Sequence, residues 1–539
     1  MDQCNESVGI TIGPIVKTIM NASSPAALWF ASFSFSDITR RLCDAISNPE
    51  NGFNAHILSP YYAGKSEIND GVGKYHDRII FTSNSLNPVK LDSIIEDVKK
   101  NTADDFPFDD SRIATEDFLK KYLQISYVIL DEKEIGNENC ILKLSQYLDC
   151  LELMQTFPEK NAADPFMKIF IGDGRSDSHN ELIKRSRLYK TIDSKNNQFS
   201  TAGHSNGIRS IESIASCDNK ADNSLKWGLY YAVVQADGDG LTKFLKNLVV
   251  KDTNDEIDQE KTNQRITSFS KACLEYNKTV AEMIHEFTGM TIYAGGDDLL
   301  FLAPLQKEEP EKKKSIFSLC KEINQEFFKA VRTELGESAK DIPTISFGIS
   351  IQYYKAPLYE AVAQARSLLD EVKSSNETRN SCNINLEKHS GQSIRFLVPN
   401  GRVDVLQNIF RIEDNGQTEK KDRTVTSVIH TLELYRDLIY LGNIKVNNED
   451  DYLAAWMNLF DNPTQSAFAD YIRKLGKEYY EDFVHVSDNQ RPIRVPNAAV
   501  TKEYFTEEGK PDPNKVSLKV FLYLLEYKKF MVEKRGDER

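Results

Sequence analysis

The sequence predicts an α+β protein in which two ferredoxin-like βαββαβ units are joined by a helical insert and followed by an all-α region. Three observations lead to this fold class. Short apolar strands alternate with amphipathic helices at the start of the chain and again after residue 226. Beyond residue 400 only the helical period is found. At 539 residues the chain is also too long for a single hydrophobic core, so several domains are expected.

The first predicted domain is residues 1–130. Alternating and continuous apolar runs mark its strands, and stretches with helical period lie between them. The expected elements are, in chain order, a strand at 8–12, a helix around 26–31, a strand at 77–81, a helix at 91–100 and a closing strand at 124–130.

Residues 131–225 are expected to form a linker domain of helices and loops. Its first part has a helical pattern. The stretch 173–206 is dense in Ser, Asn, Asp and Gly, a composition typical of long loops, and the helical pattern returns at 213–215.

The second ferredoxin-like unit is predicted over residues 226–400. Its first strand, 229–235, is a continuous apolar run of the kind expected of a central strand buried on both faces. The later elements are expected as a helix at 266–287, a hairpin of strands 290–294 and 299–302, a helix at 312–334, a strand at 344–351, a helix at 358–373 and two short strands at 382–386 and 394–397.

The fourth predicted domain, residues 401–539, contains four or five amphipathic helices, the last at 516–532. It has no acidic cluster at the end of a strand. Its amphipathic stretches at 425–441 and 518–531 are therefore interpreted as docking and core surfaces rather than as a second active site.

Composition narrows the class of protein. No apolar run approaches the roughly 20 residues that a membrane-spanning helix needs, and the first residues lack a signal-peptide pattern, so a cytoplasmic protein without a membrane partner is expected. The eight cysteines are scattered without a CxxC pair, which predicts buried free thiols and no zinc site. A net charge of −14 is unsuited to binding RNA without basic partners.

Two acidic clusters carry the functional prediction. The sequence DGDG at 237–240 ends the first strand of the second unit, and GGDD at 295–298 forms the tip of the following hairpin. Because this strand and the hairpin are adjacent in a ferredoxin-like sheet, we expect the clusters to face one another. Alone, GGDD could be a surface turn and DGDG a loop or calcium site, although EF-hand spacing is absent.

Clustered carboxylates predict a divalent cation. Two carboxylates about 5 Å apart repel by about 3 kcal/mol at an effective dielectric constant of 20. Hard oxygen ligands suit Mg²⁺ or Mn²⁺. Two such ions would activate a ribose 3′-hydroxyl for attack on the α-phosphate of a nucleoside triphosphate and stabilise the departing pyrophosphate. The predicted activity is metal-dependent nucleotidyl transfer, as in a cyclase or polymerase.

These motifs resemble the palm domain shared by GGDEF-type and class III cyclases. More closely, the chain is similar over most of its length to the large polymerase-cyclase subunit of type III CRISPR complexes, of the Cmr type. The resemblance rests on Ile12-Gly13-Pro14, Leu28-Trp29, the runs ADGDG at 236–240 and YAGGDD at 293–298, and the segments 346–349, 355–358, 365–369 and 372–373.

The resemblance also implies roles for individual residues. Asp237 and Asp298 would be the metal-bridging pair, supported by Asp297 and the carbonyl of Gly238, and the three aspartates would be catalytic. Ser270 would face the adenine. The implied nucleotide-binding residues are Gly238, Asp239, Gly295, Gly296, Ser270, Lys355 and Lys373, the two lysines as triphosphate contacts.

The sequence departs from the family pattern in three ways. A first palm that starts at residue 8 is expected to leave no room for the HD phosphohydrolase domain with which many relatives begin. The adjacent His76 and Asp77 open a predicted strand and are interpreted as incidental, so no DNase activity is expected. The zinc-binding cysteine cluster is missing, and Ile12-Gly13-Pro14 stands where the second palm has DGD, so the first palm is interpreted as a degenerate partner.

The family's activity, as implied by the resemblance, is synthesis of cyclic oligoadenylate from ATP, activated by target RNA bound to a guide RNA complex with other type III subunits. A subset without the HD domain instead joins AMP to S-adenosylmethionine, which would then be a co-substrate. Two further alternatives stay open. A stand-alone diguanylate-type cyclase is disfavoured by Asp298, where those proteins have glutamate, and a silent scaffold is disfavoured by the intact acidic clusters.

Overall fold

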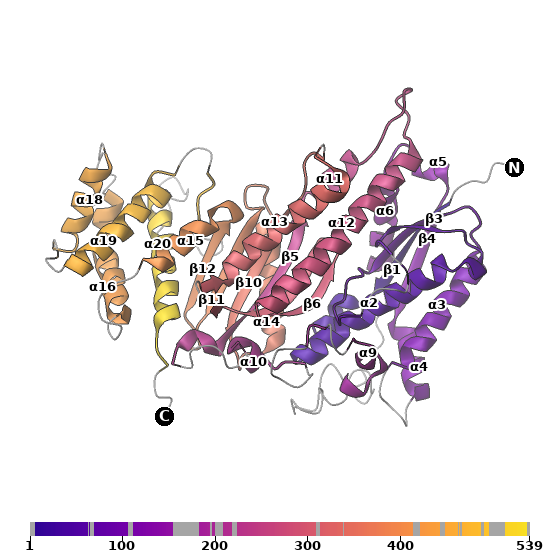
Figure 1. The fold of residues 1–539 in the computed structure, drawn as a ribbon, viewed down its shortest axis with the longest axis horizontal. Coiled ribbons are helices and arrows are strands. Elements are labelled where there is room, and N and C mark those ends of the chain that lie inside the picture. The colour runs from indigo at the N-terminus through magenta and orange to yellow at the C-terminus, as the bar shows by residue number, and fades with distance from the viewer. Residues whose placement is uncertain are drawn as a thin grey trace.

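The computed structural model describes most of the 539 residues. The described residues are 6–62, 64, 69–105, 112–154, 183–193, 197–199, 208–217, 224–308, 313–337, 339–412, 421–441, 448–461, 463, 466–486, 490–494 and 513–535. Figure 1 shows two sheets side by side, with the C-terminal helices beyond the second sheet.

The first sheet has four antiparallel strands in the order β2-β3-β1-β4. With α1 and α2 between β1 and β2 and with α3 and α4 between β3 and β4, this is the ferredoxin-like topology that the sequence predicts. The elements are β1 (Glu6–Gly13), α1 (Ile15–Ile19), α2 (Pro25–Ser47), β2 (His56–Ser59), β3 (Arg78–Ser83), α3 (Pro88–Ala103), α4 (Arg112–Tyr122) and β4 (Gln124–Leu130).

The second sheet has six strands in the order β12-β11-β10-β5-β7-β6. Its four strands β10-β5-β7-β6 repeat the ferredoxin-like order, and β11 and β12 extend it, so the α+β class with two such units is confirmed. The elements are β5 (Tyr230–Asp239), α11 (Leu241–Asn247), α12 (Gln259–Glu286), β6 (Met290–Gly295), β7 (Asp298–Pro304), β8 (Gln306–Glu308), β9 (Lys313–Ser315), α13 (Ile316–Leu335), β10 (Thr344–Tyr353), α14 (Leu358–Lys373), β11 (Ser381–Glu387) and β12 (Ser393–Pro399).

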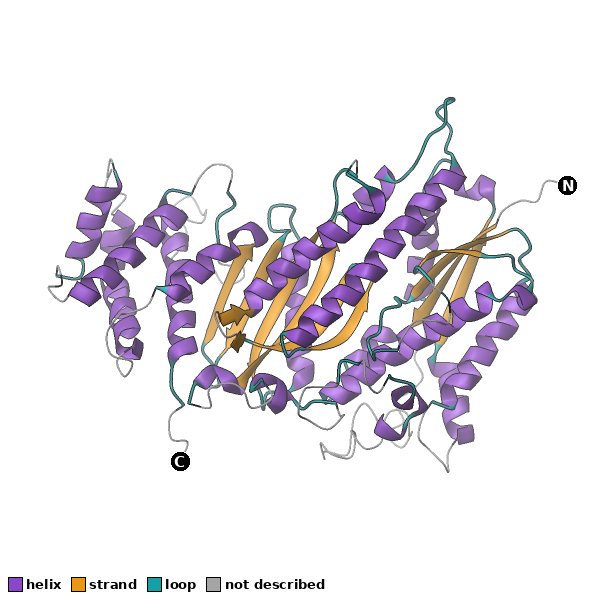
Figure 2. Ribbon diagram, viewed as in Figure 1, coloured by secondary structure: helices purple, strands orange, loops and turns teal. Residues whose placement is uncertain are grey.

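Strand β5 is buried on both faces, which explains its continuous apolar sequence. Ala232 and Val234 belong to the core shared with α12 and α13, the two long helices that cross one face of the sheet in Figure 2. Tyr231 and Val233 belong to the other core, which includes residues of α14 and α2. The strand runs four residues beyond the predicted end at 235, because residues up to Asp239 still pair with β10.

The two units pack against each other reciprocally. Helix α2 of the first unit contacts strand β6 of the second, and α12 of the second contacts β2 of the first. Residues 71–73 lie along the outer edge of β6, where the amide of Ala294 donates to the carbonyl of Gly73 at 2.9 Å. The amide of Thr291 donates to the side chain of Gln198 at 3.0 Å. The first unit and the linker therefore fix the strand that leads into the GGDD turn.

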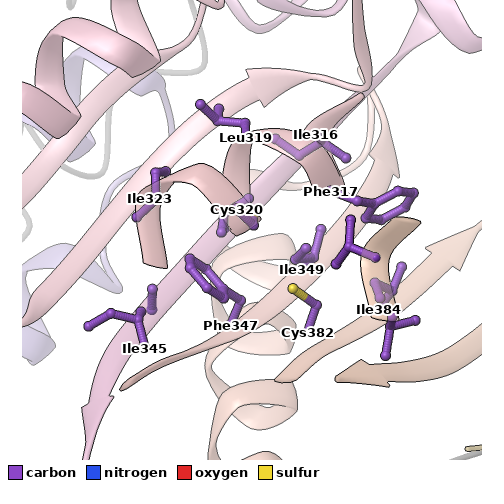
Figure 3. Packing of buried hydrophobic residues seen from close by; sticks show 14 of the residues in the cluster. Ile316, Phe317, Leu319, Cys320, Ile323, Ile345, Phe347, Ile349, Cys382 and Ile384 are labelled. Carbon is purple, nitrogen blue, oxygen red and sulfur yellow. The ribbon is translucent and has the colours of Figure 1, made fainter. Parts of the chain in front are cut away.

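The cysteine prediction is confirmed for most of the described thiols. Six of the seven described cysteines are buried and all seven are free, whereas Cys150 is exposed. Figure 3 shows Cys382 of β11 and Cys320 of α13 among apolar side chains such as Phe347 and Ile349 of β10. These thiols act as small core side chains.

The remaining described elements belong to the linker and the C-terminal region. Helix α6 packs on β1, and α16 packs on α20. The regular elements among the described residues after 402 are helices, as predicted, whereas the four domain boundaries stay a prediction. The elements are α5 (Glu132–Ile135), α6 (Cys140–Leu153), α9 (Arg187–Lys190), α10 (Ile211–Ala215), α15 (Val403–Arg411), α16 (Lys421–Leu434), α17 (Arg436–Leu441), α18 (Glu449–Asn458), α19 (Ser466–Tyr479), a π-helical turn (Tyr480–Val484) and α20 (Pro513–Val532).

Within the described part of the chain, every helix is too short or too polar to cross a membrane. Most of the predicted loop stretch at 173–206 lies outside the described residues.

Replacing Gly348 with alanine should force α14 away from β10. A Cβ at Gly348 would overlap the carbonyl oxygen of Ala365 and lie 2.6 Å from the amide nitrogen of Leu369, both in the backbone of α14. Overpacking of this kind costs about 1–3 kcal/mol. We therefore expect Gly348→Ala to lower the melting temperature in thermal unfolding. The matched control is Gly401→Ala, which meets nothing within 4 Å. Equal melting temperatures for the two variants would contradict this packing.

Candidate active site

The end of β5 forms one side of the candidate site. Asp237 pairs in register with Ser346 of β10, and Gly238 follows it. The ammonium group of Lys373, the last residue of α14, donates to the Asp237 carboxylate and, at 2.8 Å, to the carbonyl oxygen of Gly238. Burial, with a contribution from Arg379, lowers the pKa of Lys373 to about 8. Lys373 thus holds the two groups that the sequence predicts as metal ligands.

The GGDD turn forms the opposite side. Gly295 and Asp298 pair across the hairpin, which leaves Gly296 and Asp297 as the two turn residues. Gly296 has φ +69°, the left-handed conformation required at the first central position of a type II′ turn and accepted by glycine without strain. The sequence of this turn therefore dictates its backbone.

The two acidic clusters meet at Gly238. A Cβ on Gly238 would overlap the carboxylate of Asp297, so only glycine allows this close approach. The Gly238 amide donates to the Asp297 carboxylate. The structure therefore brings together Asp237, Gly238 and the GGDD turn, as the sequence indicates.

Like charge is concentrated on this turn. Asp297 is half-buried and Asp298 is exposed. Burial, together with the nearby charge of Asp239, raises the pKa of Asp297. The negative charges of Asp297 and Asp77 act on Asp298, and the positive charge of Arg366 offsets them in part. The cationic side chains nearby do not neutralise all of the negative charge on these carboxylates. A set of oxygen donors with excess negative charge suits Mg²⁺ or Mn²⁺.

Before any ion is bound, the carboxylates are not gathered into a coordination shell. Across the described residues, no group of three or more His, Cys, Asp or Glu side chains is arranged so that it could hold a metal ion. Lys373 instead neutralises Asp237. Metal binding would require the Lys373 ammonium to leave Asp237 or to share it with the ion.

Asp239 lies in a buried hydrogen-bond network. Its carboxylate is buried and accepts hydrogen bonds from the hydroxyl of Thr344 at 2.8 Å, the hydroxyl of Ser346 at 2.8 Å and the amide of Asn380 at 2.9 Å. Burial is the main cause of its raised pKa. Three protein donors thus hold this carboxylate in place, and the role of Asp239 in nucleotide binding stays a prediction.

Ser270 and Lys355, the two other predicted nucleotide contacts, lie at different distances from the site. Ser270 lies on the buried face of α12, one turn before Cys273. Burial, followed by the nearby charge of Asp297, raises the pKa of the Cys273 thiol, so this part of α12 lies near the GGDD turn. Lys355 comes shortly after Tyr353, the last residue of β10, which pairs with the start of β5. Asp237 pairs with Ser346, seven residues before Tyr353. Seven strand residues span roughly 23 Å. Lys355 therefore lies far from Asp237 along the sheet, and its contact with a triphosphate stays a prediction.

The sequence interpretation missed the pair His76-Asp77. The imidazole of His76 bonds to the Ser59 hydroxyl at 2.9 Å, and its Cδ2 atom would lie 3.7 Å from a Cβ on Gly296. The charge of Asp77 raises the pKa of Asp298. Burial, followed by the charge of Glu152, raises the pKa of Asp77 itself to about 6. The pair is therefore part of the wall of the site and is not incidental.

The strand register explains this position. Thr11 of β1 pairs with Arg78 of β3, and Ala236 of β5 pairs with Leu299 of β7. If the two units are superposed by register, Asp77 occupies the position of Asp298. Aligning the strand starts of the internal pseudo-repeat could have revealed this correspondence from the sequence.

The fold and this geometry agree with what the comparisons with known proteins find. Residues 230–383 match the family model described as Cas10/Cmr2, second palm domain. These residues are similar to a Cas10/Cmr2 second palm domain. The Cas10/Cmr2 match covers β5, the GGDD hairpin, β10 and α14, which are the elements that carry the site, and it confirms the resemblance predicted from the motifs.

Two kinds of relatives extend the comparison. The CRISPR system Cmr subunit Cmr2 of Pyrococcus furiosus is 29% identical over 207 residues, which is 36% of this chain and 22% of that protein. The aligned part thus spans about a fifth of the length of that relative. A type III-B Cmr-beta cryo-EM structure in the apo state is similar over 97% of this chain and 82% of its own, with 12% identity and a TM-score of 0.56. Another, bound to cognate target RNA, has a TM-score of 0.54, 12% identity and coverage of 98% and 83%. These structures share the fold of this chain.

Asp239→Ala and Asp298→Ala should have opposite effects on the free energy of unfolding. Asp239→Ala leaves the hydroxyls of Thr344 and Ser346 without this acceptor, whereas the amide of Asn380 keeps its bond to Ser346. Each buried unsatisfied group costs about 1–3 kcal/mol. Asp298→Ala removes repulsion from Asp297 and Asp77, so this variant should be at least as stable as the parent chain. Denaturant unfolding in the presence of EDTA measures both changes. A destabilised Asp298→Ala variant would argue against uncompensated charge on the turn.

Proposed function

We propose that this chain is the ATP-using cyclase subunit of a type III CRISPR complex of the Cmr type, and that it makes cyclic oligoadenylate by attack of a 3′-hydroxyl on an α-phosphate. The observation that carries the proposal is the approach of the GGDD turn to Asp237 and Gly238 within a Cas10/Cmr2 palm. The carboxylates of an inactive palm would gain nothing from such close contact, because like charges destabilise the fold when nothing offsets them.

Mg²⁺ or Mn²⁺ would be held by the carboxylates of Asp237, Asp297 and Asp298 and the Gly238 carbonyl, where it would supply charge stabilisation for the attacking and leaving oxygens. The residues of the chain prepare this site. Lys373 donates to both the Asp237 carboxylate and the Gly238 carbonyl and so holds the two groups close together. Once it is released from Asp237, the same ammonium group can neutralise a phosphate oxygen of the bound triphosphate.

The first palm supplies the remaining wall. His76 and Asp77 border the GGDD turn on the side that faces away from β5. A site between two palms has room for two nucleotides, one as donor of the nucleotidyl group and one as acceptor of the attack. This division agrees with a first palm that lacks its own pair of acidic clusters but retains Asp77 at the register position of Asp298.

Lys373 and Lys355 should differ in their effect on catalysis. We expect Lys373→Met to lower nucleotide synthesis by at least 10-fold, in the range found when a group that orients metal ligands is removed, about 10- to 100-fold. Lys355→Met should leave synthesis unchanged because Lys355 lies at the far end of β10. Asp297→Ala combined with Asp298→Ala should abolish synthesis.

The assay incubates the RNA-activated complex with labelled ATP and Mg²⁺ or Mn²⁺, with and without S-adenosylmethionine, and identifies products by mass spectrometry. Cyclic oligoadenylate from ATP alone supports the proposal. A product that forms only with S-adenosylmethionine would replace it with AMP conjugation, and undiminished product from the double aspartate variant would exclude this site as the catalytic centre.

Synthesis should also require target RNA. The net charge of −14 makes unaided RNA binding weak, so the signal has to arrive through partner subunits and guide RNA. One similar structure is that of a Cmr-beta complex bound to cognate target RNA. Shifting a two-state equilibrium from 1:99 to 99:1 takes about 5.5 kcal/mol of differential binding, which a long RNA duplex can supply.

The measurement compares product formed by the isolated chain, by the complex, and by the complex with matched or mismatched RNA. We expect product only with matched RNA. Equal rates in the four samples would instead indicate a constitutive, stand-alone cyclase.

A further inference from the structure

The loop between α14 and β11 touches both residues that support Asp237. This loop, residues 374–380, begins directly after Lys373. At its far end the amide of Asn380 donates to the carboxylate of Asp239 and to the hydroxyl of Ser346, each at 2.9 Å. Asn380 has φ +56°, a left-handed conformation that asparagine tolerates better than most residues. The shape of this loop therefore determines where Lys373 and Asp239 lie.

The side chain of Arg491, beyond residue 400, holds the backbone of that loop. The guanidinium of Arg491 donates to three of its carbonyl oxygens, those of Glu377 at 3.1 Å, Arg379 and Asn380 at 2.8 Å. The rigid fork of arginine suits several acceptors at once, whereas a lysine can satisfy fewer of them with fixed geometry. Arg379 in turn donates to the carbonyl of Lys373 at 3.4 Å, which ties the start of the loop to its end.

Arg491 is itself anchored to two parts of the molecule. The backbone of Arg494 pairs with Leu397 of β12 through hydrogen bonds of 2.8 and 2.9 Å. The side chain of Gln490 accepts from Arg402 at 3.0 Å, and Arg402 also donates to the carboxylate of Asp482 at 2.9 Å. Asp482 belongs to the π-helical turn that follows α19. Residues 490–494 thus connect the C-terminal helices to the loop behind the active site.

We infer that Arg491 is a positioning residue of the candidate active site, through which the C-terminal helical region controls the arrangement of Asp237. This inference rests on the proposed function. Arg491 holds the loop 374–380, the loop holds Lys373 and Asp239, and these hold the end of β5 that carries Asp237. A partner that shifts the C-terminal helices would change metal and nucleotide binding at the palm without touching it.

The test compares Arg491→Gln with Arg494→Gln. Both changes remove one guanidinium from the same segment, but the Arg494 side chain bonds only to the exposed carboxylate of Glu377, at 3.4 Å. Calorimetry measures binding of a non-hydrolysable ATP analogue with Mn²⁺ to the assembled complex. Removing a group that orients metal ligands typically weakens binding by about 10- to 100-fold, and we expect at least 10-fold weaker binding for Arg491→Gln. Arg494→Gln should stay within about twofold of the parent complex, since exposed ion pairs contribute little.

Two further measurements separate positioning from loss of fold and from failure of the proposed function. Arg491→Lys, which keeps the charge but not the fork, should recover part of the binding, and it provides the test if Arg491→Gln fails to assemble. The Mn²⁺ concentration for half-maximal binding should rise in Arg491→Gln, whereas a smaller folded fraction would lower only the number of sites. Unchanged affinity in Arg491→Gln overturns the inference. If the parent complex makes no nucleotide product but Arg491→Gln still weakens binding, the proposed function is refuted and the role of Arg491 stays intact.

Discussion

Repulsion among the carboxylates at the end of the second sheet is the constraint on which the rest of the structure depends. Asp297 lies on the two-residue turn next to Gly238, Asp298 begins β7 directly after it, and Asp77 approaches from the first unit. A fold that was selected only for stability would disperse these charges. Here the surrounding packing keeps them close, and part of the hydrophobic stabilisation from the two shared cores offsets the repulsion.

The supporting residues act by restricting motion. Asp239 accepts hydrogen bonds from two residues of β10 and from the loop before β11, so the end of β5 is held against β10 and cannot separate to relieve the charge. On the other side, residues 71–73 and the side chain of Gln198 hold β6, which prevents the hairpin from bending outward. The active residues are thus held between a buried hydrogen-bond network and the neighbouring palm, and such preorganisation is what electrostatic catalysis requires.

Local patterns in the sequence predict the parts of the structure that depend on local physics. The apolar run of β5, the helical period of α14 and the glycine turn at Gly296 each follow from a few consecutive residues. The hydrogen-bond partners of Asp239 and the distance of Lys355 from Asp237 have no local signal in the sequence, because they depend on register between strands that are more than 100 residues apart. His76 gave no local signal at all, since its contact with the GGDD turn exists only after the two units have packed.

The coverage of the second sheet has a consequence for assembly. One edge, β6, is occupied by the backbone of residues 71–73, and the other, β12, exchanges two hydrogen bonds with Arg494. An open edge can recruit a strand from another molecule, which leads to strand addition or to aggregation. Both edges of this sheet are blunted by segments of the same chain, so a neighbouring subunit gains little by extending the sheet. Neighbours therefore have to recognise side chains on helices and loops, and a change in those side chains can alter the choice of neighbour without disturbing the sheet that carries the catalytic strand.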